Sequence, residues 1–212
     1  EISRKGWGQP AFYNTDAIIQ ELLNAGKSII DARQGGASGC VETGAFGKEA
    51  YILTGYLNLP KILELTLYDG FDKISGRQLG PHTGQATDFG SFDEFFQAFR
   101  LQRRHFVDIK VRGNQIIEQL YAKQMPVPFL SVVVDDCIAK GQDYNAGGAR
   151  YNTSYIQGVG IGTLTDSLAA IKVNVFDQQR FSMAALLQAL DSDFADNEVI
   201  YHLVREKTPK YG

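Results

Sequence analysis

The chain has 212 residues, of which 44% are hydrophobic and 21% charged, and this is the composition of a globular protein. Its 21 Lys and Arg residues against 24 Asp and Glu give a formal charge of -3, which provides no general attraction to polyanions. Two cysteines exclude a disulfide scaffold, and no apolar run approaches the roughly 20 residues that span a bilayer. We therefore expect a cytoplasmic protein that binds neither nucleic acid nor membrane.

The two ends of the sequence suggest a piece of a longer protein. The chain begins at Glu1 without an initiator Met, and it ends at Gly212 directly after a charged helical stretch. No repeat, low-complexity tract or linker divides it. We expect one domain or part of one.

The first quarter of the chain reads as helix, loop and helix. Cap residues at 14–16 precede an apolar helical face, and Gly26 stands where a left-handed stop belongs. Five glycines interrupt 31–47, which predicts a loop with tight backbone demands. Helical character resumes over 49–56, and Pro60 opens a further helix through Leu67, which Asp69-Gly70 closes.

The middle of the chain is dominated by one long helical pattern. Residues 72–90 are a polar surface excursion, after which a capping box, Ser91-x-x-Glu94, begins a helix that extends toward Gln124. A break near Gly113 would divide it into two. The apolar run 129–138 is compatible with either a strand or a buried helix, because periodicity does not distinguish them.

The last quarter alternates loop, strand and helices. Gly147-Gly148 marks a sharp loop, and loose alternation predicts a strand over 151–161. The pattern then predicts three helices, over 163–175 with Thr163, Thr165 or Asp166 as cap, over 183–190 with Ser182 as cap, and over 197–205.

The segment 35–44 combines reactive side chains with glycines, which permit backbone conformations that other residues avoid. In an extended segment, Cys40 and Glu42 would project from the same face and address one bound molecule. A carboxylate two residues away disfavours the thiolate, so the thiol stays protonated, which argues against a cysteine protease and favours hydrogen-atom transfer. The alternative is a small packing cysteine in a glycine turn.

Gly39-Cys40-Val41-Glu42 resembles the Cys-x-Glu loop of the glycyl radical enzymes. The resemblance covers nearly the whole chain and rests on an ordered set of motifs. These are Trp7-Gly8-Gln9-Pro10, Asn14-Thr15-Asp16, Gly47-Lys48-Glu49-Ala50-Tyr51, 126–136, 147–152, 158–160 and 166–170.

The resemblance implies an α/β fold, helix-rich, in which residues 1–212 are an internal fragment of one catalytic domain, part of the C-terminal half of a ten-stranded barrel. It implies that Cys40 lies on a finger loop and becomes a thiyl radical, and that Glu42 is the general base for a substrate hydroxyl. No cofactor is expected to be bound, and the glycyl radical would form on a residue outside this chain. The implied partners are a small-molecule substrate, an activating enzyme that uses S-adenosylmethionine and an iron-sulfur cluster, and a second copy in a homodimer.

The resemblance also narrows the reaction. Family members that transfer acetyl groups use two adjacent cysteines, and position 39 is Gly here. The continuation 43–51 is most similar to members that dehydrate trans-4-hydroxy-L-proline to 1-pyrroline-5-carboxylate, which makes the full protein a hydro-lyase and this piece alone inactive. Alternatives are another radical eliminase or decarboxylase acting on glycerol, diols, choline or aryl acetates, or a formate acetyltransferase-type enzyme.

Other signals are weaker. Tyr56 is a candidate for lining the substrate pocket, although a tyrosine on an apolar helical face is more often a core residue. Cys137 has no second ligand at metal spacing, and Gly158-x-Gly160-x-Gly162 lacks the context of a dinucleotide fingerprint. The non-enzymatic alternative is a helical module that docks a partner through 91–124, whose basic residues we interpret as a solvated face.

Overall fold

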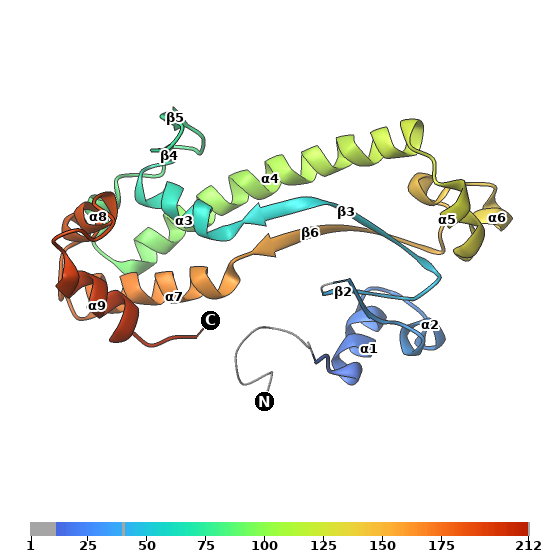
Figure 1. Cartoon of the computed structure of the whole chain (residues 1–212), viewed down its shortest axis with the longest axis horizontal. Helices are drawn as coiled ribbons and strands as arrows, with labels where there is room; N and C mark the ends of the chain where they lie inside the picture. The colour runs from blue at the N-terminus through green and yellow to red at the C-terminus, as the bar shows by residue number, and fades with distance from the viewer. Residues whose placement is uncertain (1–11, 40, 212) are drawn as a thin grey trace. The chain divides into compact units, whose positions relative to one another are not determined.

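A computed structural model describes residues 12–39 and 41–211 (Figure 1). The chain forms two compact units, the first made of Glu1–Gly55 and Asn114–Ile156 and the second of Tyr56–Gly113 and Gln157–Gly212.

The first unit contains short helices around a small hairpin and the first parts of two long strands. Its elements are α1 (Thr15–Asn24), α2 (Ile29–Arg33), β1 (Gly36–Ser38), β2 (Glu42–Gly44), the beginning of β3 (Glu49–Asn58), the end of α4 (Phe92–Gln124), α5 (Pro128–Val133), α6 (Cys137–Lys140), the 3-10 turn η3 (Tyr144–Ala146) and most of β6 (Tyr151–Val159).

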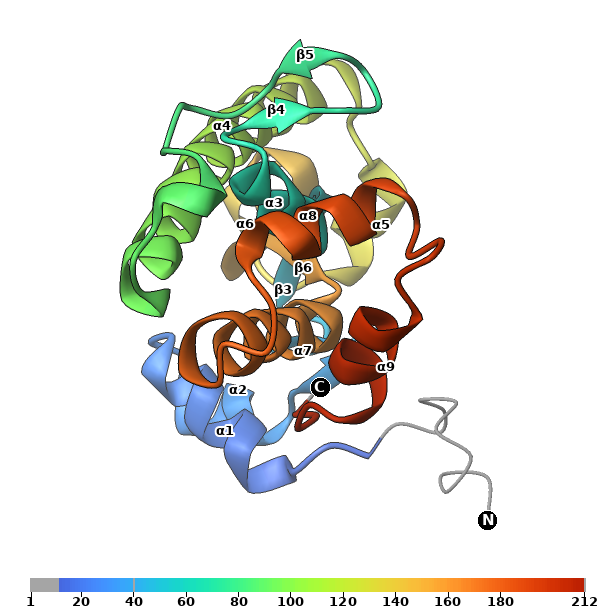
Figure 2. The same ribbon diagram turned by 90° about the vertical axis from the view of Figure 1, so that its left-hand side faces the viewer.

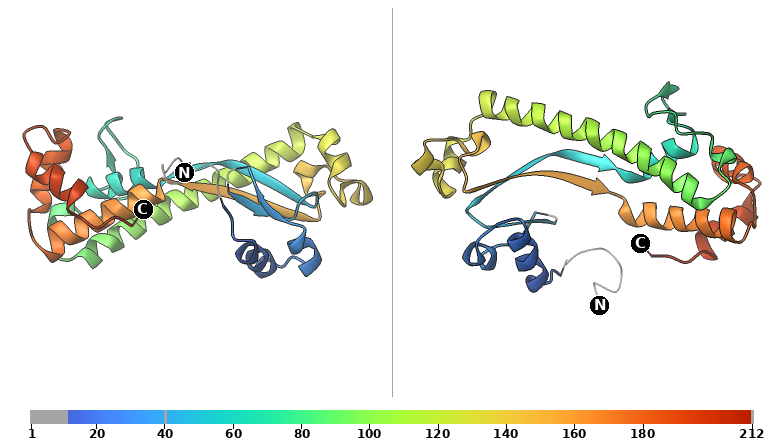
Figure 3. Two further views of the ribbon diagram at one scale, coloured as in Figure 1. Left: turned by 60° about the horizontal axis from the view of Figure 1, so that its bottom comes forward. Right: turned by 180° about the vertical axis from the view of Figure 1, so that it is seen from behind.

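The predicted first helix is confirmed, together with both of its ends. The Asn14 side chain accepts a hydrogen bond from the Ala17 amide at 3.1 Å, and Gly26 adopts a φ of +82° after the last turn. Leu22 is buried on its apolar face. Figure 3 shows α1 beside α2 and the hairpin, so this helix supports the segment that carries the candidate site.

The glycine-rich loop contains the antiparallel hairpin of β1 and β2, in which Ser38 pairs with Glu42 and Gly36 with Gly44. The fold therefore places Glu42 at the start of the second strand of this hairpin. The prediction of a loop over 31–47 missed these short strands, because three residues are too few to show a period.

The prediction of a helix over 49–56 is wrong, since Glu49–Asn58 forms β3, which pairs with β6. The strand alternates its faces. Ala50 is buried in a cluster with Val134, Cys137 and Ala149, and Ile52 packs against that cluster. Pairing with a distant strand overrides local helical character here. The predicted strand over 151–161 is confirmed as β6.

The second unit is mainly helical. Its elements are the end of β3, α3 (Leu59–Leu67), the small hairpin of β4 (Phe71–Asp72) and β5 (Arg77–Gln78), the 3-10 turn η2 (Ala86–Asp88), the beginning of α4, the end of β6, α7 (Ile161–Ile171), a π-helical turn η4 (Lys172–Asp177), α8 (Met183–Asp191) and α9 (Glu198–Glu206). Figure 2 shows α7, α8 and α9 together.

One hydrophobic core fills the second unit. It includes Ile62 and Leu63 of α3, Phe95 and Phe99 of α4, and Leu186 of α8. One face of α4 is thus occupied by the chain's own core, while the basic residues on its other positions, Arg100, Arg103 and Arg104, are exposed as predicted.

Helix ends in the second unit follow the sequence closely. The helix over 60–67 and its stop at Asp69-Gly70 are confirmed, with Gly70 at a φ of +80°. In the capping box, the Glu94 amide donates to Ser91 Oγ at 3.3 Å, and the Glu94 carboxylate accepts from the Gly90 amide at 2.8 Å. Ser182 caps α8 as predicted. The helix α4 continues through Gly113 without a break.

The run 129–138, for which strand and helix were both left open, forms the short helices α5 and α6. One further expectation is corrected: α7 begins at Ile161, so that Thr163, Thr165 and Asp166 lie inside the helix instead of capping it. The positive φ of Gly160, +80°, sets the earlier start. In Figure 1, β3 and β6 run in the same direction and each leads into a helix, as in an α/β fold. The ten-stranded barrel stays a prediction.

Candidate active-site hairpin

Glu42 lies next to the tip of the β1–β2 hairpin. Its Oε2 accepts a hydrogen bond from the Val41 amide at 3.2 Å, so the carboxylate folds back toward the tip. Gly39 has a φ of +58°, and a Cβ added there would lie 2.7 Å from Glu42 Oε2. Glycine is therefore favoured at position 39, both by the positive φ and by the carboxylate beside it. Cys40 lies outside the described residues, as does Trp7-Gly8-Gln9-Pro10.

Thr43, the next residue in β2, is held from three sides. Its backbone pairs with Ala37, its hydroxyl donates to Glu21 Oε1 of α1 at 2.7 Å, and its carbonyl accepts from the Tyr155 hydroxyl of β6 at 2.5 Å. The strand that presents Glu42 is thus fastened to a helix and to a long strand.

A buried carboxylate fastens the base of the hairpin. Glu49 is 2% exposed and accepts hydrogen bonds from the Ala45 amide at 2.7 Å and the Thr153 hydroxyl at 2.5 Å. The Lys27 ammonium, on a residue that is 8% exposed, lies 3.0 Å from Glu49 Oε1. The charge of this carboxylate is therefore balanced inside the fold, where an unpaired charge would be costly.

Two tyrosines stack beside the hairpin. The rings of Tyr51 and Tyr155 have centroids 5.8 Å apart and are inclined by 13°. Burial, and then the Glu49 charge, raise the pKa of Tyr51 to about 12, and the same two causes raise the pKa of Tyr155. Both phenols stay protonated in neutral solution, so they can donate hydrogen bonds but cannot act as bases.

Gly44 ends β2 against these side chains. A Cβ added there would lie 2.3 Å from Tyr51 Oη and 2.5 Å from Glu49 Oε2, closer than real contacts allow. The absence of a side chain at position 44 therefore lets the hairpin approach the two strands.

A second ionic cluster supports α2 and the turn before β3. Asp31, itself buried, accepts from Lys48 Nζ at 2.5 Å and from the Tyr151 hydroxyl at 2.8 Å. The Lys48 ammonium, followed by the Tyr151 hydroxyl, holds the pKa of Asp31 well below its usual range in spite of burial. Arg150 lies 3.5 Å from Asp31 and also pairs with Asp136 at 3.0 Å.

Tyr56 belongs to the second unit, whereas the hairpin belongs to the first. It begins the second unit, near the end of β3, and it is 63% exposed. The expectation that it packs in a core on a helical face is therefore wrong, while a role in lining the substrate pocket stays a prediction.

The residues of β6 that bond to the hairpin and to the elements beside it were not predicted from the sequence. Tyr151, Thr153 and Tyr155 project from one face of β6, and each bonds to the segment around the hairpin. A signal was present, since these polar and aromatic residues alternate at the two-residue period of a strand. What they contact could not be read from that period.

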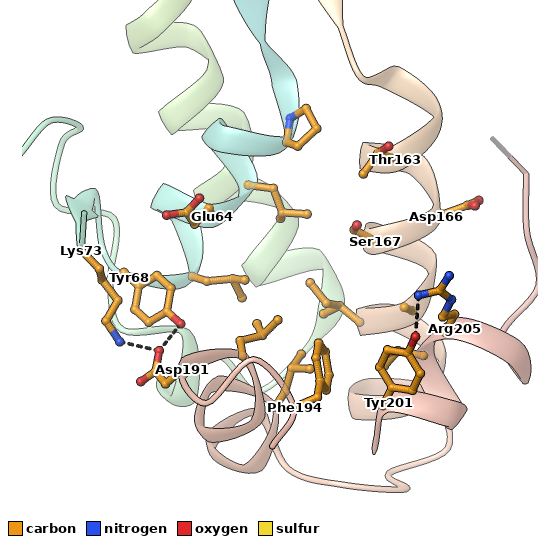
Figure 4. Close-up of a pocket in the computed structure, with 18 of the residues that line it drawn as sticks. Glu64, Tyr68, Lys73, Thr163, Asp166, Ser167, Asp191, Phe194, Tyr201 and Arg205 are labelled. Atoms are coloured by element: carbon orange, nitrogen blue, oxygen red, sulfur yellow. Dashed lines mark hydrogen bonds and ion pairs between the residues drawn. The ribbon is translucent and has the colours of Figure 1, made fainter. Parts of the chain in front are cut away.

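A groove of about 1170 Å³ lies in the second unit, and its lining includes neither Glu42 nor Tyr56. Some of its labelled polar residues bond to each other, as the dashed lines in Figure 4 mark. Asp191 accepts from the Tyr68 hydroxyl at 2.6 Å and pairs with Lys73, while Arg205 donates to the Tyr201 hydroxyl.

Cys137 is 2% exposed in the first unit, and burial raises the pKa of its thiol. This agrees with a packing role. Across 12–39 and 41–211, no group of three metal-ligating side chains is placed to hold an ion. Over the same residues, no helix is both long and apolar enough to cross a bilayer.

Known proteins resemble the chain over its whole length. The family model described as pyruvate formate lyase-like matches residues 1–212. A trans-4-hydroxy-L-proline dehydratase from Clostridioides difficile is 65% identical over 212 residues, which are 100% of this chain and 27% of the relative. A (2S)-3-sulfopropanediol dehydratase from Klebsiella oxytoca is 36% identical over 214 residues, covering 100% of this chain and 26% of the relative.

Solved structures agree with these matches. The crystal structure of the hydroxyproline dehydratase from Clostridioides difficile with trans-4-hydroxy-L-proline bound has a TM-score of 0.92 and 64% identity, covering 100% of this chain and 27% of that one. A glycerol-bound B12-independent glycerol dehydratase from Clostridium butyricum has a TM-score of 0.86 and 40% identity, with 100% and 27% covered. The chain therefore spans about a quarter of the length of its relatives. With a family model matched from end to end, the chain belongs to the pyruvate formate lyase-like family of glycyl radical enzymes.

Proposed function

We propose that the protein containing this chain is a glycyl radical dehydratase that converts trans-4-hydroxy-L-proline to 1-pyrroline-5-carboxylate and water. The observation that carries the proposal is the 65% identity to a trans-4-hydroxy-L-proline dehydratase over all 212 residues, including the segment that forms the hairpin. By their names, the relatives of lower identity act on other small molecules. The choice of substrate in this proposal therefore rests on the higher identity to the hydroxyproline enzyme.

The hairpin supports a division of work between Cys40 and Glu42. Glu42 is directed to the tip by the Val41 amide, on a strand fastened at Thr43. A carboxylate in a fixed pose next to the proposed thiyl residue is suited to move a proton of the same substrate molecule. The radical glycine would lie outside this chain. It would take the hydrogen atom from the Cys40 thiol.

The proposed reaction balances without an external oxidant or reductant. Cys40 takes a hydrogen atom from the ring carbon beside nitrogen and later returns a hydrogen atom to the carbon that carried the hydroxyl. The hydroxyl leaves as water with a proton that the ring nitrogen gives up. For this substrate the role expected for Glu42, base to a substrate hydroxyl, becomes the transfer of that proton from the ring nitrogen to the leaving hydroxyl. An activating enzyme that uses S-adenosylmethionine, a homodimeric full-length protein and a cytoplasmic location belong to the same proposal.

The test uses the full-length protein, activated anaerobically. The wild type should dehydrate trans-4-hydroxy-L-proline in preference to glycerol, 1,2-propanediol and 3-sulfopropanediol, with the product identified by mass spectrometry. Cys40→Ser should form the glycyl radical, seen by electron paramagnetic resonance, and should give no product. Turnover by Cys40→Ser would exclude the proposed thiyl step, and a preference for a diol would replace the proposed substrate.

A further inference from the structure

We infer that Tyr155 is a positioning residue for Glu42, because its hydroxyl fixes the strand from which the Glu42 carboxylate projects. The inference deepens the proposed function and rests on it. Tyr155 donates to the Thr43 carbonyl at 2.5 Å, and Thr43 directly follows Glu42 in β2. Tyr155 follows Glu42 by 113 residues in the sequence, so the fold brings its hydroxyl to the hairpin.

The hairpin is short and needs support from the elements around it. β1 and β2 are three residues each, and a two-stranded hairpin of this size is marginally stable by itself. Its fixed pose therefore depends on contacts with the elements around it. At Thr43 these contacts are the Tyr155 hydroxyl on the carbonyl and Glu21 on the side chain.

Tyr155 is itself held rigidly. Its ring stacks on Tyr51 at a centroid distance of 5.8 Å, and Thr153 on the same face of β6 bonds to the buried Glu49. Because burial raises its pKa, the phenol keeps its proton and donates continuously. A rigid ring with a permanent donor is suited to fix the position of a carbonyl.

A bond that fixes the Thr43 carbonyl also fixes the direction of the Glu42 side chain, because the two residues are consecutive in one strand. Their side chains project to opposite faces of the same backbone. A rotation of β2 around its axis would carry the Glu42 carboxylate away from the Val41 amide and the tip. Proton transfer requires heavy atoms within about 2.6–3.2 Å, and a misplacement of about 1 Å can cost about 100-fold in rate. Loss of one hydroxyl at Tyr155 is thus expected to reduce kcat.

The experiment compares Tyr155→Phe with Tyr151→Phe in the activated full-length enzyme. Both variants remove a phenol oxygen from the same face of β6, but the Tyr151 hydroxyl bonds to Asp31 and the Ser28 amide rather than to the hairpin. Tyr155→Phe should lower kcat by about 10- to 100-fold, change KM less than about threefold, and leave the yield of glycyl radical unchanged. Tyr151→Phe should keep kcat even if its melting temperature falls.

Amide hydrogen exchange gives a second readout that does not need turnover. The amides of 42–44 should exchange faster in Tyr155→Phe than in the wild type, whereas Tyr151→Phe should leave them protected. A kcat within twofold of wild type for Tyr155→Phe, or equal losses of kcat in both variants, would overturn the inference. If the wild type does not dehydrate hydroxyproline, the proposed function fails, and the same comparison is made with the substrate that it does convert.

Discussion

Lys27 Nζ and Glu49 Oε1 lie 3.0 Å apart, and both side chains are almost completely buried. Lys27 follows the end of α1, and Glu49 is the first residue of β3. The pair thus joins the helix beside the hairpin to the strand that leaves it. Burying two charges is costly, so the pair is stable only because each partner compensates the other.

Replacing Glu49 by Gln should destabilise the protein strongly, because the Lys27 ammonium would be left buried without its counter-charge. We expect the free energy of unfolding to fall by about 3–5 kcal/mol. Urea unfolding followed by circular dichroism measures it. The matched control is Asp177→Asn, which removes the exposed ion pair with Lys172 and should cost less than about 1 kcal/mol. Equal effects of the two substitutions would show that the buried pair has no special role.

Replacing Glu42 by Gln should suppress elimination without preventing formation of the thiyl radical. The amide keeps the size of the side chain but cannot accept a proton, and loss of a general base typically costs about 100- to 10,000-fold in kcat. In heavy water, the variant should still place deuterium into recovered substrate, because the thiol exchanges its hydrogen and returns it after each abstraction. Mass spectrometry of substrate and product measures both rates.

The control for this prediction is Glu21→Gln, which removes a carboxylate charge but leaves an amide oxygen that can still accept the hydrogen bond from the Thr43 hydroxyl. It should retain most of kcat. Unchanged dehydration by Glu42→Gln would assign the proton transfer to another group.

Local signals in the sequence predicted much of the fold. Asn14, Gly26, Asp69-Gly70 and Ser182 mark helix ends correctly, because caps depend on a few neighbouring residues. The helix predicted over 49–56 is a strand, because this segment pairs with β6, which begins 102 residues after Glu49. Non-local pairing is not visible in a short window.

The same distinction between local and non-local features applies to the candidate site. The spacing of Glu42 from Cys40 and the resemblance of 39–42 could be read directly from the sequence. The contacts of Glu49 with Lys27 and Thr153, and of Tyr155 with Thr43, could not, because they join segments that are distant in the chain. Residues that carry chemistry can therefore be found by motif, but residues that position them require the fold.

Gly44 and Gly47 should differ sharply in their tolerance of alanine. At Gly44 an added Cβ would lie 2.3 Å from Tyr51 Oη and would displace the hairpin, so Gly44→Ala should reduce kcat by about 100-fold. Gly47 has a φ of +70° with nothing within 4 Å of the added Cβ, so Gly47→Ala should cost only about 1–2 kcal/mol of backbone strain. Steady-state kinetics and urea unfolding of both variants separate the two effects. A larger loss of kcat at Gly47 would contradict this account.

The Asp31 cluster should make the protein sensitive to acid. The pKa of Asp31 in the folded state is held below its value in the unfolded chain, mainly by Lys48, so the carboxylate contributes stability above the unfolded pKa of about 3.9. That contribution is lost as the pH falls from about 5 toward the folded pKa. Asp31→Asn removes the titrating group and should therefore be less stable than the wild type at neutral pH.

The difference between Asp31→Asn and the wild type should shrink as the pH falls, because protonation removes from the wild type what the substitution has already removed from the variant. Melting temperatures measured at intervals between about pH 7 and pH 2 would show the two curves converging on the acid side. Asp108→Asn, at an exposed position of α4, should run parallel to the wild type through the same range. A difference in melting temperature between Asp31→Asn and the wild type that stays constant with pH would contradict this prediction. It would mean that the Lys48 and Tyr151 contacts persist after protonation and that the Asp31 charge does not stabilise α2.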